Sequence, residues 1–429
     1  MPLFDGDGLP FDPPPQPAPR RRRRSTRRKV VSAVGILSAL LVLAAGGLAV
    51  YVHSWFGGLS RVTISHVATT APDAPAVGGF EPAPVDPSGA VNVLITGSDG
   101  RACIDPKSPY AGAFLGNGVA TGARSDTVLV LRLDPAAKTM AILSFPRDLW
   151  VTVPGGGHDR INATFRADNP SPLVQTIEAN FGVRIDHYVG VDFCAFRDVV
   201  NAVGGLSVPF QSPARDSHTG LDVTQPGCHA MNGDEALAYV RSRYYEHQVN
   251  GKWVNDGTSD LGRIARQQDF IRRLATKAIS AGVTNPLTAK RLLDSTTKSN
   301  VRIDAGLGLI DLVRYAKLVK DLGPQHATSY RLDGKDTVIR GGSVIVADLT
   351  SAPSRAMLAV FRGQRDTGVA PPSSSGTGPG LLPTTTTRRA GSTKTTTAPA
   401  TATPTAVANP ADAASNMTGV YPPADVSCP

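Results

Sequence analysis

The central part of the chain alternates short apolar runs with longer amphipathic stretches, which is the pattern of strands interleaved with helices. Three runs rich in β-branched residues predict strands at 91–97, 127–134 and 139–146. The tight link 135–138 joins the last two runs as a hairpin. Helical periodicity is found at 172–182, 192–205, 233–240, 262–282 and 309–323. Further strands are predicted at 186–191, 206–210 and 342–349. This order predicts an α/β/α layered sandwich with a central mixed β-sheet.

A longer apolar run stands before this region. Residues 30–52 carry no charge, and at about 1.5 Å per residue they can cross a hydrocarbon layer of about 30 Å. We predict one N-terminal transmembrane helix there, with a cleaved signal peptide as the alternative. Eight basic residues lie between Arg20 and Lys29, and the next one is Arg61. The positive-inside rule therefore predicts a single-pass membrane protein with a cytoplasmic N-terminus and an extracellular catalytic domain.

Composition divides the rest of the chain into segments. Residues 1–29 are rich in Pro and basic residues and are predicted to be a disordered cytoplasmic segment. The Pro-rich stretch 53–89 is predicted to be an extended extracellular spacer. The Thr/Pro-rich stretch 364–429 has too few apolar residues for a core and is predicted to be a disordered tail. The globular domain is therefore expected at 90–363.

Net charge adds little evidence about partners. The formal charge is +9, but eight of the basic residues lie in the segment before the apolar run. The remainder is close to neutral, so nucleic-acid binding is not supported and no such partner is expected. The basic segment is explained by membrane topology, with binding to anionic lipid or a cytosolic partner as the alternative.

The four cysteines form an even set in a domain that is predicted to be exported. They are Cys103, Cys194, Cys228 and Cys428, and none has the CxxC spacing of a metal or redox site. Three complete pairings are possible. We favour a Cys194–Cys228 disulfide inside the domain and a Cys103–Cys428 disulfide that holds the tail.

Charged residues gather at the ends of the three predicted N-terminal strands. They are Asp99, Arg101, Arg124, Asp126, Arg147 and Asp148. Antiparallel pairing of neighbouring strands would bring them to one edge of the sheet. Asp99 and Asp126 suit Mg²⁺, or Mn²⁺ in its place, because these ions take oxygen ligands and retain phosphate oxygens and waters. The guanidinium groups suit phosphate. A surface network of salt bridges is the alternative interpretation.

A second basic group follows the predicted helix 233–240. If that helix ends near Val240, Arg241 and Arg243 share one face of an extended segment and form an anion clamp. Alternatively, they are solvated cations favoured by the helix dipole. In the helix that follows, Arg263 lies at the unfavourable N-terminus, and Gln267 lies one turn later beside the apolar stripe. Such a glutamine either bonds backbone groups in the core or reaches a polar cavity.

Eight segments in order resemble the LytR-CpsA-Psr family of cell-wall glycopolymer ligases, in its actinobacterial type. They are GSDGR, RSDT, SFPRD, DRINATF, GVDF, NAVGG, MNGDEALAYVRSR and GRIARQQDF, and they cover residues 91–282. The resemblance implies an α/β/α fold. It also implies transfer of a glycopolymer, arabinogalactan among the candidates, from a polyprenyl-pyrophosphate carrier to the muramic acid 6-hydroxyl of peptidoglycan. The implied partners are that lipid-linked donor, the peptidoglycan acceptor and membrane lipid.

The resemblance also implies roles for single residues. The metal-binding aspartates of the family fall on Asp99 and Asp126. Its pyrophosphate-binding arginines fall on Arg124, Arg147, Arg241, Arg243 and Arg263, with Arg160 at the basic position of the DRINATF segment. Catalytic roles are expected for Arg147, Arg263 and Gln267. The general base is not identified, because Asp148 is a candidate that can also hold Arg147 in place. A polyprenyl-pyrophosphate hydrolase and a non-catalytic wall-binding regulator are the competing functions.

Overall fold

The structure is a computed structural model that describes only part of the chain. The described residues are 60–67, 86, 89–100, 103, 105–111, 125–283, 301–332, 334–364, 421 and 428. The predicted cytoplasmic segment, the apolar run 30–52 and most of the tail lie outside them. Within the described ranges, no helix combines the length and the apolar character that a membrane crossing requires. The N-terminal transmembrane helix therefore stays a prediction.

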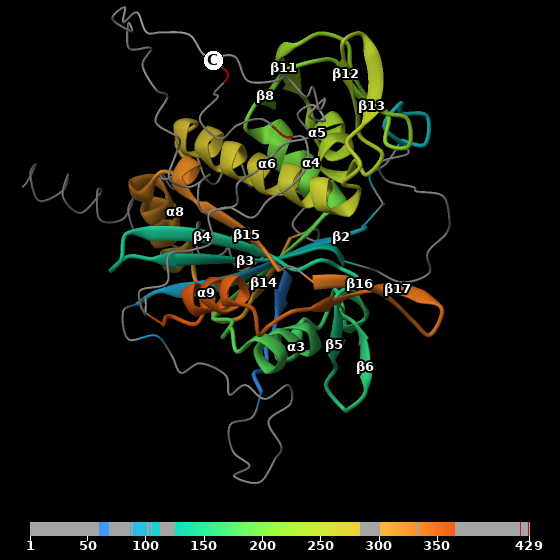
Figure 1. The fold of residues 1–429 in the computed structure, drawn as a ribbon. Helices are drawn as coiled ribbons and strands as arrows, with labels where there is room; N and C mark the ends of the chain where they lie inside the picture. The colour runs from blue at the N-terminus through green and yellow to red at the C-terminus, as the bar shows by residue number, and fades with distance from the viewer. Residues whose placement is uncertain are drawn as a thin grey trace, which may run out of the picture. The chain divides into compact units, whose positions relative to one another are not determined.

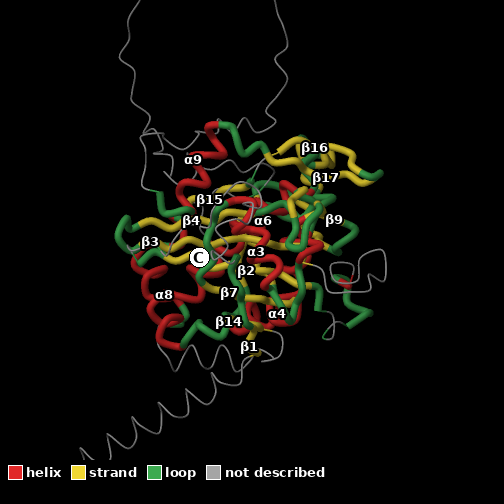
Figure 2. The backbone as a smooth tube through the Cα atoms, turned by 90° about the horizontal axis from the view of Figure 1, so that it is seen from below, coloured by secondary structure: helices red, strands yellow, loops and turns green. Residues whose placement is uncertain are grey.

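A seven-stranded mixed sheet forms the centre of the domain (Figures 1 and 2). Its strands, in spatial order, are β1 (Ser60–Val62), β14 (Val301–Asp304), β7 (His187–Asp192), β2 (Val91–Ser98), β3 (Ser125–Asp134), β4 (Thr139–Ser144) and β15 (Thr328–Arg331). The β1–β14, β7–β2 and β4–β15 pairs are parallel and the others are antiparallel. The predicted mixed sheet is confirmed, and β3 and β4 form the predicted hairpin.

The register of this sheet decides where the charged residues lie. β2 pairs with β3 from Val91 opposite Leu133 to Ser98 opposite Ser125, with an irregularity between Gly97 and Ser98. The end of β2 and the start of β3 therefore lie side by side. Ser144, the last residue of β4, pairs with Leu129, so the chain after β4 runs on towards the same edge. The side chains predicted to converge thus begin from neighbouring backbone positions.

One face of the sheet is covered by α3 (Ser171–Phe181) and α9 (Ala352–Phe361) (Figure 1). Alternate sheet residues such as Leu94, Val130 and Leu143 point to this face because successive strand side chains point to opposite sides. They form one hydrophobic core with Ile177 and Phe361 of the two helices. Burial of this apolar surface is the main stabilising term of the layer.

The other face carries α4 (Phe193–Ala202), α5 (Gly233–Arg241), α6 (Asp260–Ser280) and α8 (Leu309–Leu322) (Figure 1). A second hydrophobic core joins Val200, Tyr239 and Phe270 of the first three helices. All five predicted helices are present to within two or three residues at each end. The helices on both faces confirm the layered arrangement.

Small additional sheets surround these layers. They are β5 (Trp150–Thr152) with β6 (His158–Arg160), β8 (Leu206–Phe210) with β11 (Gly227–Met231), β16 (Gly334–Ile339) with β17 (Gly342–Ala347), and a four-stranded sheet of β10 (Leu221–Val223), β9 (Ala214–Asp216), β12 (Glu246–Val249) and β13 (Lys252–Asn255). Short 3-10 helices, η2 (Ile161–Thr164) and η4 (Pro324–His326), complete the described elements. The strands predicted at 206–210 and 342–349 are real but belong to these small sheets.

The prediction of an extended spacer over 53–89 is wrong for its described part. Ser60–Val62 pair with β14 as an edge strand of the central sheet. The chain then continues along α3, where Ser65 N donates to Ser171 Oγ (3.0 Å) and Val67 N donates to Glu178 Oε2 (3.1 Å). The sequence pattern did not predict this strand because its apolar content is low: an edge strand of three residues needs only one buried side chain.

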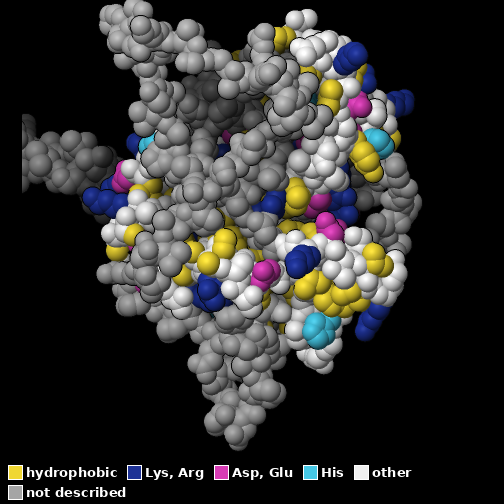
Figure 3. All heavy atoms as spheres, viewed as in Figure 1, with side chains coloured by type: hydrophobic (Ala, Val, Ile, Leu, Met, Phe, Trp, Pro, Cys, Tyr) yellow, Lys and Arg dark blue, Asp and Glu magenta, His cyan; other side chains and the backbone are white. Residues whose placement is uncertain are grey.

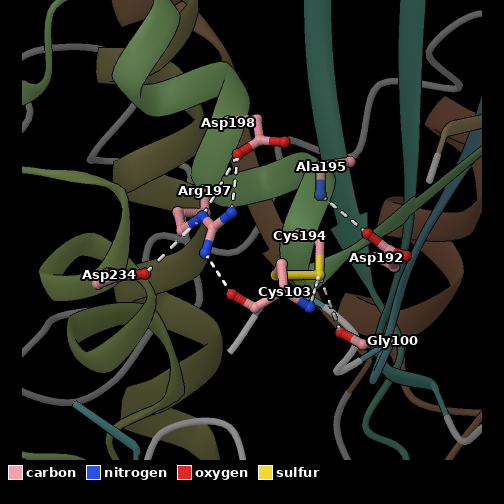
Figure 4. The surroundings of a disulfide bond; sticks show 8 residues. All are labelled: Gly100, Cys103, Asp192, Cys194, Ala195, Arg197, Asp198 and Asp234. Atoms are coloured by element: carbon pink, nitrogen blue, oxygen red, sulfur yellow. Dashed lines mark hydrogen bonds and ion pairs between the residues drawn. A yellow bond between two sulfur atoms is a disulfide. The ribbon is translucent and has the colours of Figure 1, made fainter. Parts of the chain in front are cut away.

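The predicted disulfide pairing is also wrong. Cys103 bonds to Cys194 and Cys228 bonds to Cys428. Cys194 lies in the first turn of α4, directly beyond β7, and the chain after β2 passes this point (Figure 4). Arg197 of the same helix donates to the carbonyl of Cys103 (2.7 Å). The parallel β2–β7 pair therefore brings Cys103 close to Cys194. Cys228 of β11 then bonds to the remaining cysteine, Cys428, near the C-terminus.

Replacing Cys228 and Cys428 with serine together should lower the free energy of unfolding by about 2–5 kcal/mol. The bond joins residues separated by 200 positions, and it holds the tail where Tyr421 packs on Ile264 and Ala265 of α6. Urea unfolding of the wild type and the double variant, both non-reduced, measures the difference. An unchanged midpoint and slope would show that this bond does not restrict the unfolded chain.

Asp304 gives the domain a defined pH dependence. Its carboxylate accepts hydrogen bonds from Tyr188 N (3.0 Å) and Gly306 N (2.9 Å) and lies 3.3 Å from His187 Nδ1. Burial alone would raise the pKa of Asp304, but His187 and the two amides lower it below the usual value. A carboxylate with a lowered pKa stabilises the fold at neutral pH, and this stabilisation is lost as pH falls below about 4.

Asp304→Asn should therefore be less stable than the wild type at pH 7, and the difference should shrink below about pH 4, where the wild-type carboxyl also becomes protonated. Urea unfolding at pH 7 and pH 3 measures both differences. Equal differences at the two pH values would contradict the lowered pKa of Asp304.

Candidate active site

Asp126 is the centre of a cluster of arginines at one edge of the sheet. Arg147 Nη1 donates to its Oδ1 (2.9 Å) and Arg241 Nη2 donates to its Oδ2 (3.0 Å). Arg263 Nη2 donates to the backbone carbonyl of Asp126 (3.0 Å). Three guanidinium groups from separate parts of the chain therefore meet at the start of β3. Of the strand-end residues predicted to converge, Asp126, Arg147 and Asp148 lie together here.

Two more aspartates extend the cluster. Oδ1 of Asp260, the first residue of α6, lies 2.8 Å from Nη2 of Arg243 and 2.8 Å from Nη2 of Arg263. Asp148 lies between Nε of Arg147 and Nε of Arg160, at 3.3 Å from each. Arg160 also donates to the carbonyl of Ser343 in β17 (2.9 Å). Arg160 therefore belongs to the outer part of the cluster.

Local backbone structure explains why Arg241 and Arg243 point to one place. Asn232 caps α5 by accepting hydrogen bonds from the amides of Asp234 and Glu235, and the helix ends at Arg241. Ser242 then has extended geometry, with φ −57° and ψ 128°. Side chains two apart in an extended segment share a face. Arg241 thus reaches Asp126 and Arg243 reaches Asp260, as the clamp interpretation predicts.

The cluster is partly shielded from water, which strengthens its electrostatics. The side chain of Arg263 is only 2% exposed, and that of Arg241 is 18% exposed. The Arg241 guanidinium also lies 4.3 Å from the centre of the Phe193 ring, a cation–π contact. The cluster therefore contains one nearly fully buried guanidinium group, that of Arg263, and one that is stacked on an aromatic ring, that of Arg241.

The pKa directions follow from this crowding. Burial would raise the pKa of Asp126, but Arg263, Arg241, Arg147 and Arg243 lower it far more strongly, so this carboxyl stays ionised. Burial, and then Arg263, lower the pKa of Arg243 to about 10. Burial likewise lowers the pKa of Arg241, against the opposing effect of Asp126. Burial is thus the largest cause of the lowered pKa at both arginines, and at Arg243 the neighbouring Arg263 adds to it.

Charge in the described part of the cluster is nearly balanced. Arg147, Arg160, Arg241, Arg243 and Arg263 face Asp126, Asp148 and Asp260, and Asp99 raises the pKa of Arg241 from nearby. The alternative of a salt-bridge network therefore describes the contacts, but the network is partly buried and joins β3, β6, α5 and α6 with the loops between them. On the face shown in Figure 3, basic and acidic side chains likewise lie together instead of forming a patch of one sign.

The remaining predicted residues occupy different positions. Asp99 follows β2 at the same edge and is half-buried. Gln267 is buried on α6, one turn after Arg263, and its amide donates to the carbonyl of Val240 (3.2 Å) at the end of α5. Gln267 therefore supports the backbone that carries Arg241. Arg124 lies outside the described residues, so its role stays a prediction.

Sequence reasoning gave no role to Asp260 and Phe193. Asp260 stands three residues before Arg263, a spacing at which opposite charges on a helix meet, so this partner was detectable. Phe193 begins α4 beneath Arg241, a contact between residues far apart in sequence that no local pattern marks. Both residues limit the positions that the arginines can adopt.

Asp99 and Asp126 fit a metal ion that takes most of its ligands from substrate and water. Among the described residues, no group of three His, Cys, Asp or Glu side chains is arranged to hold a metal. Asp99 and the ionised Asp126 offer two carboxylates at one strand edge. Mg²⁺ is commonly bound by one or two carboxylates and completed by substrate phosphate oxygens and waters. The two aspartates suit that mode.

Comparison with known proteins places these features in a family. The model of the LytR_cpsA_psr family matches residues 63–355. The chain is 33% identical over 274 residues to the probable cell wall biosynthesis protein LcpB of Corynebacterium glutamicum, covering 62% of this chain and 59% of LcpB. It is 34% identical over 220 residues to the polyisoprenyl-teichoic acid–peptidoglycan teichoic acid transferase TagV of Bacillus subtilis, covering 47% of this chain and 52% of TagV.

A third relative is matched over more of its length. The chain is 27% identical over 304 residues to the B. subtilis transferase TagT, covering 69% of this chain and 85% of TagT. Among solved structures, a LytR-Csp2A-Psr enzyme from Actinomyces oris has a TM-score of 0.51 at 23% identity, covering 71% of this chain and 95% of that one. The aligned region thus spans little more than half of LcpB and TagV. Because the family model matches more than half of the chain, the protein belongs to the LytR-CpsA-Psr family.

Proposed function

We propose that this protein is a phosphotransferase-type ligase. It moves a glycopolymer from a polyprenyl-pyrophosphate carrier to the muramic acid 6-hydroxyl of peptidoglycan. The observation that carries the proposal is the partly buried cluster in which Arg147, Arg241 and Arg263 meet around Asp126. Relatives named as teichoic acid–peptidoglycan transferases and as a cell wall biosynthesis protein support the reaction class.

The arginines would carry most of the catalysis. The oxygen of the acceptor hydroxyl attacks the phosphorus atom attached to the sugar, the bond from that phosphorus to the lipid phosphate breaks, and the hydroxyl proton passes to solvent. Negative charge then moves onto the lipid phosphate that leaves. Guanidinium groups can donate two parallel hydrogen bonds to phosphate oxygens and stabilise that charge. Asp126, Asp148 and Asp260 hold these groups in place before substrate binds.

Asp99 and Asp126 would hold Mg²⁺, or Mn²⁺ in its place, which supplies further positive charge to the diphosphate oxygens. Gln267 keeps the end of α5 in position through Val240, so we assign it a supporting role. Asp148 pairs with both Arg147 and Arg160, so we assign it the role of holding these arginines and not that of a general base.

The sheet offers a surface for the lipid chain. Ile95, Leu131, Val189 and Val191 are apolar but only half-buried. They alternate with residues of the α3 and α9 core, so they point to the face that α4, α6 and α8 cover. β2 and β3 run from this apolar strip to the arginine cluster. A prenyl chain along the strip would place its diphosphate at the strand ends.

Location and polymer complete the proposal. We propose that residues 30–52 anchor the protein in the membrane with the catalytic domain outside, within reach of a lipid-linked donor and a wall acceptor. Arabinogalactan is the first polymer to test, because LcpB comes from Corynebacterium glutamicum, an actinobacterium.

A transfer assay tests the proposal directly. The full chain in lipid nanodiscs is supplied with a lipid-linked oligosaccharide and Mg²⁺, with and without peptidoglycan. Ligation predicts that saccharide becomes attached to wall sugar only when the acceptor is present. Equal release of saccharide in both samples indicates the competing hydrolase, and no turnover and no binding of the donor indicates a non-catalytic regulator.

A further inference from the structure

The segment Ser242–Tyr244 links the two arginines of the clamp, and it is held by groups that lie outside the cluster. It follows the last residue of α5 and leads into β12. Arg241 stands directly before it and Arg243 lies within it. The conformation of these three residues therefore sets the distance and direction between two of the guanidinium groups that would bind the diphosphate.

The side chain of Asp216, the last residue of β9, accepts hydrogen bonds from the backbone of this segment. This side chain is fully buried. Its Oδ2 accepts hydrogen bonds from Ser242 Oγ (2.6 Å), Arg243 N (3.1 Å) and Tyr244 N (2.9 Å). Its Oδ1 accepts one from His218 N (2.9 Å). A buried carboxylate is costly unless hydrogen bonds compensate it, and here three of the four come from the linking segment.

Arg266 holds the same segment from the other side. Its Nη2 donates to the carbonyl of Ser242 (2.8 Å), and its Nη1 lies 2.8 Å from Oδ2 of Asp256. The side chains of Arg266 and Asp256 are both fully buried. The amides of the segment are thus bonded to a buried anion, and one carbonyl is bonded to a buried cation. Such bonds to charged groups are stronger than ordinary ones.

We infer that Asp216 is a positioning residue for phosphate transfer. The inference rests on the proposed function, which supplies the identity of the anion. Its buried carboxylate fixes the backbone of Ser242–Tyr244 so that Arg241 and Arg243 hold the two phosphates at a set spacing. Asp216 bonds the backbone and a hydroxyl of this segment, whereas Asp126 and Asp260 pair with the guanidinium groups themselves. Its effect on the anion is therefore indirect.

The test uses Asp216→Asn in the full chain, titrated calorimetrically with inorganic pyrophosphate and Mg²⁺. The amide nitrogen of asparagine must face at least one N–H donor, whichever way it turns. We expect the number of binding sites per chain to stay the same and the Kd to rise at least about tenfold, as for loss of hydrogen bonds to a charged group. Fewer sites with an unchanged Kd would overturn the inference, because that is what loss of stability alone produces.

Glu178→Gln is the matched control. Glu178 is a fully buried carboxylate of α3 on the opposite face of the sheet. It accepts from Val67 N (3.1 Å) and Ile185 N (3.2 Å) and lies 2.8 Å from His66 Nδ1. This variant should lose stability and keep the wild-type Kd. An equal rise in Kd in both variants would show a general effect of buried charge and would also overturn the inference.

Two further measurements cover the remaining outcomes. If Asp216→Asn does not fold, Ser242→Ala removes one of the three bonds and should raise the Kd by a few fold, whereas an unchanged Kd rejects the inference. If the wild type does not bind pyrophosphate, the proposed function fails by itself. A crystal structure of Asp216→Asn then decides the inference, which requires the contacts of Arg241 with Asp126 and of Arg243 with Asp260 to be lost.

Discussion

Alanine at position 241 should lower the rate of polymer transfer by about 100- to 1,000-fold, the loss typical of removing one donor that stabilises transition-state charge. Arg241 contacts Asp126 at a largely buried position with an aromatic ring beneath it, so water cannot replace its guanidinium well. Arg243→Ala should have an effect of similar size, because this side chain shares Asp260 with Arg263. The transfer assay with a lipid-linked oligosaccharide and peptidoglycan measures both losses.

Arg184→Ala is the control for these variants. Arg184 pairs with Asp186 (3.3 Å) beside the start of β2, at the opposite end of the strand from the cluster, and its side chain is 27% exposed. It should keep near wild-type transfer. Circular dichroism should show native secondary structure in all three variants. Loss of secondary structure in Arg241→Ala and Arg243→Ala would mean that this pair holds the fold together instead of binding an anion.

The second large effect is expected for the double variant Asp99→Ala/Asp126→Ala. It should lose both transfer and the dependence of the rate on Mg²⁺, because it removes the two carboxylates at the β2–β3 edge. Asp126 is held ionised by the surrounding arginines, so it offers a charged oxygen at any pH suitable for assay. Titration of the transfer rate with Mg²⁺ measures the change. A residual rate that rises with Mg²⁺ as in the wild type would remove the metal assignment.

Asp134→Ala controls for loss of a carboxylate on the same strand. Asp134 is the last residue of β3 and Asp126 is its second, and Asp134 pairs with Arg132 (3.3 Å). Its removal should leave both the rate and its Mg²⁺ dependence unchanged. Part of the effect of the double variant will come from Arg147 and Arg241, because they lose the Asp126 carboxylate that holds them. Binding of Mg²⁺ measured without substrate separates this contribution from loss of the metal.

Elements with strong local signals were predicted well from sequence. The strands at 91–97, 127–134 and 139–146 have continuous apolar runs, and the helix at 262–282 has a regular apolar stripe. β1, β14 and β15 have three or four residues each and were missed. A short strand is stabilised by its neighbours in the sheet more than by its own residues, so its local signal is weak. The same reason explains why part of the expected spacer belongs to the sheet.

The candidate site divides in the same way. Strand-end charges and the two-residue spacing of Arg241 and Arg243 were sufficient to predict their convergence. Asp260 was overlooked although its spacing to Arg263 marked the pair. Asp216 went unrecognised, because an aspartate far away in sequence can bind any segment until the fold is known. The disulfides were mispaired for that reason also. Four cysteines allow three pairings, and the β2–β7 pair, not spacing, brings Cys103 to Cys194.

By itself, the sequence determined the residue types of the candidate site: arginines and aspartates at strand and helix ends, where local periodicity already limits their direction. Only the tertiary structure decided which aspartate pairs with which arginine, which cysteines join, and how Asp216 and Arg266 hold the clamp. The physical reason is range. Periodicity and capping act within a few residues, whereas these contacts join segments that only the closed sheet brings together.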